Sequence, residues 1–165
     1  MSFLVGATHD DSRSDKSYQA YVTYLSSIRD RLPQTVYEFA IADWHYDFTN
    51  PKCPHDAWVQ EIKISEVAGG ERHEIRKTQI EIILLGAYHD RLLKVTYSDV
   101  ASHSVNSTHS QDGYGDWLID EISLSNSGLV VHEVKFRSDA VLRIECSDII
   151  FQEQLTSTPY TAVWV

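Results

Sequence analysis

The sequence predicts an α+β domain in which two N-terminal helices pack on one face of a mostly antiparallel sheet of about six strands. Two observations carry this prediction. Apolar residues up to position 42 recur at steps of three and four, the period of an amphipathic helix. Beyond position 57 they recur at every second position, the period of a strand with one buried face. At 165 residues, the chain fits a single domain, residues 1–165.

The helical region covers residues 14–42. Its first helix carries one apolar stripe, formed by Tyr18, Tyr21, Val22, Leu25, Ile28 and Leu32. Pro33 ends that helix and suits the first turn of a second, shorter one. The preceding residues 1–13 are mostly polar and are expected to form a loose or weakly docked arm. The aromatic-rich stretch 43–54 has no clean period and is expected to be an ordered connection.

Six antiparallel strands are expected within residues 57–154. Turn signals separate them, and they cover about residues 58–66, 74–85, 91–100, 117–124, 129–136 and 141–146. The second strand ends in Ile82-Ile83-Leu84-Leu85, a run that is apolar on both faces and typical of a central strand with cover on both sides. The two predicted helices are the elements available to cover a face of this strand. Residues 101–115 are predicted to be a long polar loop.

The clearest alternation lies in the last hairpin. One face carries Val130, His132, Val134, Phe136, Leu142, Ile144 and Cys146. The other face carries charged residues of both signs, including Glu133 and Glu145. A three-residue turn at 138–140 is expected to place Phe136 opposite Leu142. One face of this hairpin is therefore predicted to be buried and the other wet and charged.

The formal net charge is −10, from 24 acidic and 14 basic residues. Nucleic-acid backbones and anionic membrane surfaces attract Lys and Arg, so the composition argues against both as partners. It is compatible with a basic protein partner, because opposite fields speed encounter. No stretch approaches the length of a membrane span, and the N-terminus lacks the pattern of a secretory signal. A cytoplasmic protein is therefore expected.

The sequence offers no recognisable catalytic motif. It contains neither a Gly-x-Ser-x-Gly elbow nor a Gly-rich loop that could cradle a phosphate. Cys146 falls on the apolar face of its strand and is expected to be a small, inert core residue. We therefore expect a non-enzymatic domain without a cofactor.

A metal site is the alternative interpretation. The dipeptide His-Asp occurs in two predicted turns, as His55-Asp56 and His89-Asp90. An Asp in a turn usually bonds nearby backbone N–H groups, which is the simpler explanation of both dipeptides. If folding brought the two turns together, however, these four side chains could bind a metal, and the chain would be a small metal-dependent hydrolase or a metal-binding protein.

A protein-binding surface is the favoured interpretation. The candidate binding residues are Trp44, Tyr46, Asp112, Asp116, Glu133 and Glu145. The two aromatic residues look exposed and suit anchors in a partner, while the carboxylates of the polar loop and of the wet hairpin face would attract basic groups. A homodimer that pairs through an edge strand is a further alternative.

Four short motifs in the β region carry a resemblance to known proteins. They are Pro54-His55-Asp56-Ala57-Trp58, Asp116-Trp117-Leu118-Ile119-Asp120-Glu121, Val131-His132-Glu133-Val134-Lys135-Phe136 and Arg143-Ile144-Glu145-Cys146-Ser147-Asp148-Ile149. With these motifs, residues 54–151 resemble small bacterial proteins in which His-Asp-Ala opens a β-rich domain, some of which look like immunity proteins of polymorphic-toxin systems. The resemblance implies a protein that binds and blocks a basic toxin, and it supplies no catalytic residues.

Overall fold

The computed structural model describes residues 2–6, 15–106, 111 and 113–156. In this part of the chain the helices are α1 (Asp15–Ile28), the single 3-10 turn η1 (Arg29–Arg31) and α2 (Gln34–Ile41). The strands are β1 (Trp58–Gly69), β2 (Ile75–Leu85), β3 (Arg91–Ser98), β4 (Ser102–Asn106), β5 (Trp117–Leu124), β6 (Val130–Phe136), β7 (Val141–Cys146) and β8 (Asp148–Leu155). The predicted single sheet of about six strands under two helices is therefore wrong. The fold is mostly β, with two four-stranded antiparallel sheets.

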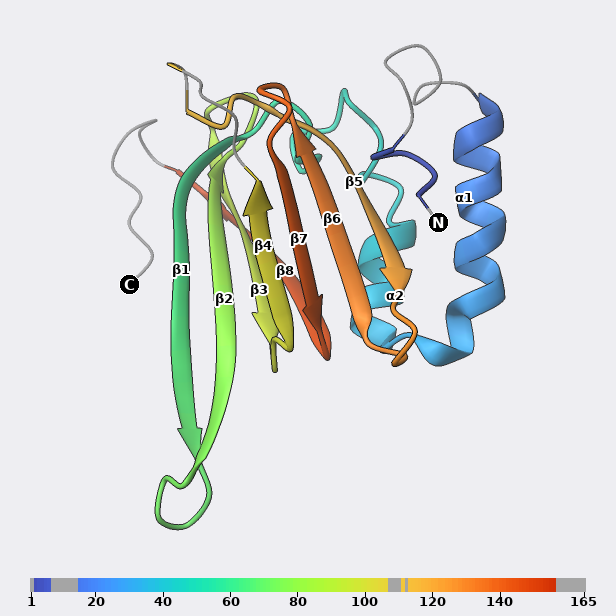
Figure 1. Cartoon of the computed structure of the whole chain (residues 1–165). Helices are drawn as coiled ribbons and strands as arrows, with labels where there is room; N and C mark the ends of the chain where they lie inside the picture. Colours follow the sequence, from blue (N-terminus) through green and yellow to red (C-terminus); the bar gives the residue numbers. More distant parts are fainter. Residues whose placement is uncertain (1, 7–14, 107–110, 112, 157–165) are drawn as a thin grey trace.

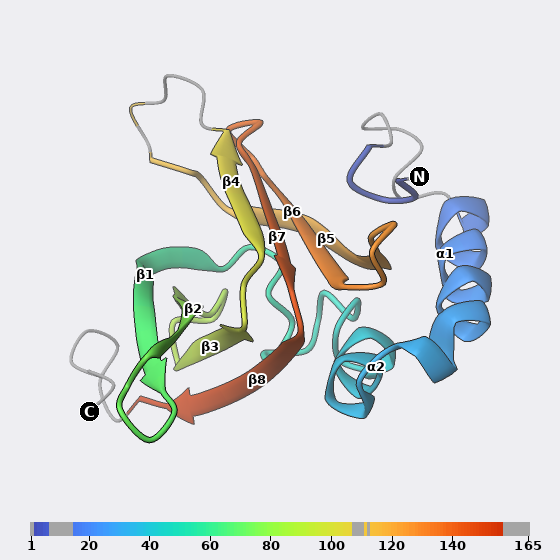
Figure 2. The ribbon, with the colours of Figure 1, turned by 60° about the horizontal axis from the view of Figure 1, so that its bottom comes forward.

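Sheet A has the strand order β1-β2-β3-β8, and sheet B the order β4-β7-β6-β5. The two sheets meet at a corner (Figure 2), where β3 leads into β4 and β7 leads into β8. Ala101 N–H donates to Glu145 O at 2.8 Å and Ser147 N–H donates to Ser98 O at 3.0 Å, so the ladder continues through the bend. Strands that switch sheets at a bend produce this kind of corner.

The bend explains why the strand count was wrong. The predicted polar loop 101–115 contains β4, in which all five residues are exposed. A strand with no buried face has no apolar alternation, so its sequence looks like a loop. Residues 149–151 were expected either to extend the preceding strand or to begin another, and they belong to the separate strand β8, which only Ser147 separates from β7.

A second contact closes the structure on the opposite side of sheet B. Asp56 N–H donates to Trp117 O, and Trp117 N–H donates to Ala57 O, each at 2.9 Å. These bonds join the chain just before β1 to the start of β5. The inner faces of both sheets thus enclose one apolar core, whose largest fully buried side chains include Trp117, Tyr21, Tyr97, Phe136, Leu93, Ile122 and Ile144.

The helices do not lie across one sheet face as predicted. α1 packs along β5 and α2 packs against β8 (Figure 1). The apolar stripe of α1 buries Tyr21, Leu25 and Ile28 against the core, and α2 buries Phe39 between the sheets. The helices therefore close the open side of the β structure and cover the outer strand of sheet B.

Two tyrosine side chains of α1 cover the outer edge of β5. The N–H of Ile122 donates to the Tyr21 hydroxyl at 2.6 Å, and the N–H of Leu124 donates to the Tyr24 hydroxyl at 3.1 Å. The two tyrosines stand one helical turn apart on α1, and they match N–H groups two residues apart on the strand. An uncovered outer strand invites pairing with another chain. On β5, the tyrosine hydroxyls of α1 already accept hydrogen bonds from the outward N–H groups of the strand.

The N-terminal residues dock on sheet B. The Glu121 Oε2 atom accepts hydrogen bonds from the N–H groups of Phe3, Leu4 and Val5, at 2.9, 2.6 and 3.2 Å. Leu4 is only 2% exposed and lies in the core. Of the two expectations for the arm, loose or weakly docked, residues 3–5 fit the docked one, because a buried carboxylate far along the chain holds them. Residue 1 and most of the remaining arm lie outside the described residues.

The last hairpin keeps its predicted faces but not its predicted register. Val134 lies opposite Leu142, a shift of two residues from the expected pairing. Phe136 N–H donates to Ala140 O at 2.9 Å, and Asp139 adopts a left-handed conformation (φ 67°). Three-residue hairpin loops need a left-handed residue at this position, and Asp tolerates it. Since the shift is even, every side chain stays on its predicted face.

Candidate functional site

The two aromatic candidates are less exposed than their sequence context suggests. Trp44 and Tyr46 are both half-buried, and their rings stack on the two sides of the loop histidine His45, at 5.7 and 4.3 Å between centroids. The Tyr46 hydroxyl also donates to the Asp120 carbonyl at 3.1 Å. Both rings therefore pack on the core. A binding role for them stays a prediction.

Asp116 lies in a groove of about 1010 Å³ between the start of β1 and the turn of the last hairpin. The Arg137 guanidinium donates to Asp116 at 2.9 Å and to Asp56 at 3.2 Å. A predicted binding residue and one member of the alternative metal set thus share one arginine. Trp58, which is 47% exposed, lines the same groove. The arginine offsets both carboxylates, so this groove is not a strongly acidic surface. Asp112 lies outside the described residues.

Glu133 and Glu145 line a polar hollow of about 610 Å³ on the outer face of sheet B. Arg143 lies between them, with its Nε 3.5 Å from Glu133 and its Nη1 3.6 Å from Glu145. Both distances are longer than a good charge-assisted hydrogen bond, so the two ion pairs are loose. The hydroxyls of Ser125 and Ser127 and the charge of Arg143 lower the pKa of Glu145 below its usual value. Two carboxylates therefore share one incompletely engaged guanidinium.

A third carboxylate extends this row. Glu121 lies directly opposite Glu133 on the neighbouring strand, and Arg143 lies opposite Glu133 on the other side. Like charges placed directly opposite each other repel. The N–H groups of the N-terminal arm offset this repulsion at Glu121 Oε2, while Glu121 Oε1 is buried without a hydrogen-bond partner in the described residues. We call Glu121, Glu133 and Glu145 the acidic row.

The two His-Asp turns have separate partners. His55 Nδ1 donates to Leu118 O at 2.7 Å, whereas Asp90 accepts two bonds from its neighbour Arg91, at 2.9 and 2.8 Å. Each dipeptide contains one left-handed residue, Asp56 (φ 63°) or His89 (φ 57°), as tight turns require. Within the described residues, no group of three or more His, Cys, Asp or Glu side chains is placed to hold a metal ion.

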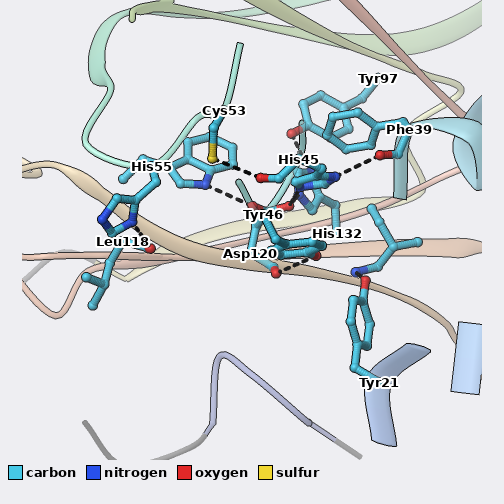
Figure 3. Close-up of polar contacts among 12 residues, drawn as sticks. Tyr21, Phe39, His45, Tyr46, Cys53, His55, Tyr97, Leu118, Asp120 and His132 are labelled. Carbon is cyan, nitrogen blue, oxygen red and sulfur yellow. Dashed lines mark hydrogen bonds and ion pairs between the residues drawn. The ribbon is translucent and has the colours of Figure 1, made fainter. Parts of the chain in front are cut away.

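A cluster of titratable side chains that the motifs do not reveal lies buried between the sheets (Figure 3). Asp120 on β5 is at its centre and is 2% exposed. Its Oδ2 atom accepts from His45 Nε2 at 2.8 Å and from His132 Nε2 at 2.9 Å, and its Oδ1 accepts from Trp117 Nε1 at 3.0 Å. We call these residues, together with Tyr97, the Asp120 network.

The two hydrogen-bond acceptors that face the ring nitrogens of His45 determine its protonation. His45 Nδ1 lies 2.8 Å from the Phe39 carbonyl oxygen, so both His45 nitrogens face acceptors and both carry protons. His45 is therefore a cation paired with Asp120. His132 Nε2 donates to Asp120, and His132 Nδ1 lies 2.8 Å from the Tyr97 hydroxyl.

The pKa shifts agree with this buried ion pair. Burial alone would lower the pKa of His45, but the charge of Asp120 and the hydrogen bonds to Asp120 and Phe39 raise it above its usual value. Burial would raise the pKa of Asp120, but the charge of His45 and the hydrogen bonds from both histidines hold it far below its usual range. Each partner keeps the other charged.

No family model matches the chain, and no curated protein matches it. No helix in the described part of the chain is long and apolar enough to cross a membrane.

The Asp120 network connects parts of the fold that are distant in the sequence. It joins β3 of sheet A, β5 and β6 of sheet B, and the loop after α2. The Cys53 thiol extends it by donating to the His45 carbonyl at 2.9 Å, and burial raises the pKa of this thiol to about 12. All of its charged groups are sealed from solvent, whereas a catalytic acid or base must reach a substrate. The network is therefore suited to hold the fold together.

One signal in the sequence pointed to this network. His132 falls on the apolar face of its strand, and a buried polar group requires a hydrogen-bond partner. The partner itself is not visible in the sequence, because His45 and Asp120 are 75 residues apart and share no motif.

Proposed function

We propose that the chain is a non-enzymatic protein-binding domain that binds a basic partner through the outer face of sheet B. The observation that carries the proposal is the polar hollow, where Glu133 and Glu145 share Arg143 at 3.5 and 3.6 Å. Because the ion pairs with Arg143 are long, a guanidinium or ammonium group of a partner would gain charge-assisted hydrogen bonds with these carboxylates. The serine hydroxyls around the hollow add further acceptors.

The charge of the whole chain supports the same partner. A net charge of −10 steers basic proteins toward the surface and increases their rate of encounter. The groove at Asp116 is a weaker candidate, because Arg137 already offsets its carboxylates. Arg143 is farther from Glu133 and Glu145, at 3.5 and 3.6 Å, than Arg137 is from Asp116 and Asp56, at 2.9 and 3.2 Å, so the carboxylates of the hollow are the less firmly paired. Glu121 is only 1% exposed and contributes charge beneath this surface, not a contact group.

The sealed position of the Asp120 network supports binding over catalysis. Strongly shifted pKa values mark active sites where a substrate can reach the group, but they also occur in structural ion pairs. In this network each ring nitrogen and each carboxylate oxygen has a hydrogen-bond partner within the fold. The shifted pKa values of Asp120 and His45 are therefore explained by the fold.

The kind of partner follows from the resemblance of residues 54–151 to immunity proteins. An immunity-like protein binds a toxin and blocks it, and an acidic one suits a basic toxin. We therefore propose that the partner is a basic toxin that this chain neutralises through the acidic row.

Capture by charge-reversed variants tests the proposal. Tagged wild type would be compared with the double variant Glu133→Lys and Glu145→Lys, using an extract of the native host. The matched control is Glu38→Lys with Asp43→Lys, which makes the same change in net charge at exposed positions of α2 and the following loop. Circular dichroism would establish that all three proteins are folded.

We expect the wild type and the control to retain one basic protein, and the Glu133/Glu145 variant to lose it at least about tenfold, because like charges at an interface cost several kcal/mol. Equal capture by all three would remove the acidic row as the contact. A growth assay then tests whether the captured protein is a toxin. The captured protein should inhibit bacterial growth when expressed alone, and co-expression of this chain should restore growth. Growth without inhibition would contradict the immunity-like role.

A further inference from the structure

The β1–β2 hairpin projects beyond the rest of the molecule (Figure 1). β3 covers β2 only over Ile80–Leu85, whereas the pairing of β1 with β2 continues to Gly69 and Ile75. The far end of the hairpin is thus a two-stranded ribbon, in which residues 70–77 are all exposed. A ribbon of two strands is marginally stable in water when nothing covers it.

The ribbon also presents a free strand edge. β1 is the outer strand of sheet A, and within the described residues no backbone group from Glu61 to Gly69 is bonded on the side away from β2. The edge of β1 differs in this respect from the edge of β5, which the tyrosines of α1 cover. An uncovered edge of this length is a template for another strand.

Exposed apolar side chains accompany the free edge. Ile64 is 53% exposed, Val67 46% and Ile75 48%. Ile64 and Val67 belong to β1 and Ile75 to β2, with Val67 and Ile75 on one face of the ribbon and Ile64 on the other. Single exposed apolar residues are common on protein surfaces, but several at the end of one hairpin favour an interaction there.

The charge of the hairpin indicates which partner fits. Residues 58–79 contain four acidic and four basic residues, so this segment is neutral and the net charge of −10 resides elsewhere in the chain. A basic partner is not attracted to a neutral surface, and a second acidic copy is not repelled by it. The charge of the hairpin itself therefore does not oppose self-association there.

We propose that a second copy of this chain pairs antiparallel with β1 along its free edge, so that sheet A continues across a two-fold interface. A two-fold axis normal to the sheet keeps each face on its own side and places one residue opposite its own copy. The structure favours Ile64 at that position, facing Ile64 of the partner subunit. This inference is independent of the proposed toxin binding, which uses the other sheet.

The register follows from the residues of β1. An axis at Glu61, Lys63 or Glu66 would place like charges directly opposite each other. An axis at Ile62 would include the bulge between Val59 and Glu61 in the pairing.

An axis at Ser65 would place Ile64, the most exposed apolar side chain of β1, opposite charged Glu66, whereas an axis at Ile64 places the half-buried Ile62 there. An axis at Ile64 uses only the regular stretch from Glu61 to Val67. It brings the most exposed apolar side chain of β1 together with its copy.

The mass in solution and a cysteine cross-link test this dimer. Sedimentation would measure the mass of the full chain from about 1 µM to about 1 mM, the range of weak association. One chain has a mass of 18.9 kDa. The test variant is Ile64→Glu, and the matched control is Ile150→Glu, at a position on the outer strand β8 that is 43% exposed.

For the cross-link, Ile64→Cys is compared with Glu66→Cys under mild oxidation. Both native cysteines are buried, so they give little background. In the proposed register the thiol of the Ile64→Cys variant would face its copy within reach of a disulfide. The two thiols of a Glu66→Cys dimer would be too far apart to form one.

We expect wild type and Ile150→Glu to reach twice the mass of one chain, and Ile64→Glu to remain at 18.9 kDa. We also expect Ile64→Cys, but not Glu66→Cys, to form the covalent dimer. A wild type that stays monomeric up to about 1 mM would overturn the proposal. A dimer that Ile64→Glu leaves intact, or equal cross-linking of the two cysteine variants, would do the same.

Discussion

Replacing Asp120 with Asn removes the anion at the centre of the Asp120 network while keeping the shape of the side chain. The carboxylate accepts three hydrogen bonds, from His45, His132 and Trp117. An Asn keeps only one carbonyl oxygen, and its NH2 group would point at a donor in place of the other oxygen. The buried His45 cation would also lose its counter-ion.

The expected loss of unfolding free energy is about 3–5 kcal/mol, the cost of removing one partner from a buried ion pair. That is a large part of the about 5–15 kcal/mol that keeps a typical domain folded. Tyr97→Phe is the milder companion variant. It leaves the buried His132 Nδ1 without its hydrogen-bond partner and is expected to cost about 1–3 kcal/mol.

The pH dependence distinguishes an ion pair from a neutral hydrogen bond. The pKa of His45 is raised above its usual 6.5, so its contribution to stability is complete below about pH 6.5 and is lost as the pH rises through the folded value. The pKa of Asp120 is lowered, so its contribution is present above about pH 3.9 and is lost as the pH falls through its folded value. In Asp120→Asn the charge of Asp120 is gone, and burial, the largest influence on the pKa of His45, outweighs the hydrogen bond to Phe39 and favours the neutral ring.

Urea unfolding at a series of pH values provides the assay, with the free energy taken from linear extrapolation. The contribution of His45 should fall as the pH rises above about 6.5 in the wild type, whereas in Asp120→Asn it should rise with pH up to about 6.5 and then level off. The difference between the two curves removes the titration of the other histidines. A loss below about 1 kcal/mol, or parallel curves, would refute a charged His45–Asp120 pair, since a neutral hydrogen bond has that smaller magnitude.

Three further predictions concern the edges and turns of the fold. Tyr21→Phe leaves a buried N–H of β5 without an acceptor and should cost about 1–3 kcal/mol in urea unfolding, and Tyr24→Phe should cost less, because its site is only partly buried; equal losses would contradict this account. Glu121→Ala should accelerate hydrogen exchange at the amides of residues 3–5, measured by mass spectrometry, and unchanged exchange would show that another contact holds the arm. Asp139→Gly should stay within about 0.5 kcal/mol of wild type while Asp139→Val loses about 1–2 kcal/mol, because only the β-branched residue is strained at φ 67°; equal stability of the two would argue against a left-handed turn.

The strands that the sequence predicted well are those with one buried face. Residues 117–124 and 141–146 were predicted from alternation and form β5 and β7 with the same bounds. β4 was missed, because neither of its faces is buried and its residues show no alternation. The corner between the sheets was missed as well, since a bend that continues the ladder leaves no mark in a period-two pattern.

The candidate residues divide in a similar way. Glu133 and Glu145 lie on the wet face as the alternation indicated, because the even register shift preserved that face. The Asp120 network could not be predicted, since its charged partners come from a loop and two strands. Only the position of His132 on an apolar face hinted at it. Local patterns show which way a side chain points, but not which distant group it meets.

The order of strands in sheet A has a consequence for synthesis of the chain. β3 needs β8 as its neighbour, but Arg91–Ser98 leaves the ribosome well before Asp148–Leu155. Until then the apolar side chains of β3 stand beside an open ladder, and closing so long a loop is slow. Nascent chains with such unpaired strands are prone to aggregation and are typical clients of chaperones. Truncation before residue 148 would leave β3 permanently without its neighbour, so we expect shortened chains to be insoluble, even though every residue of the acidic row would be present.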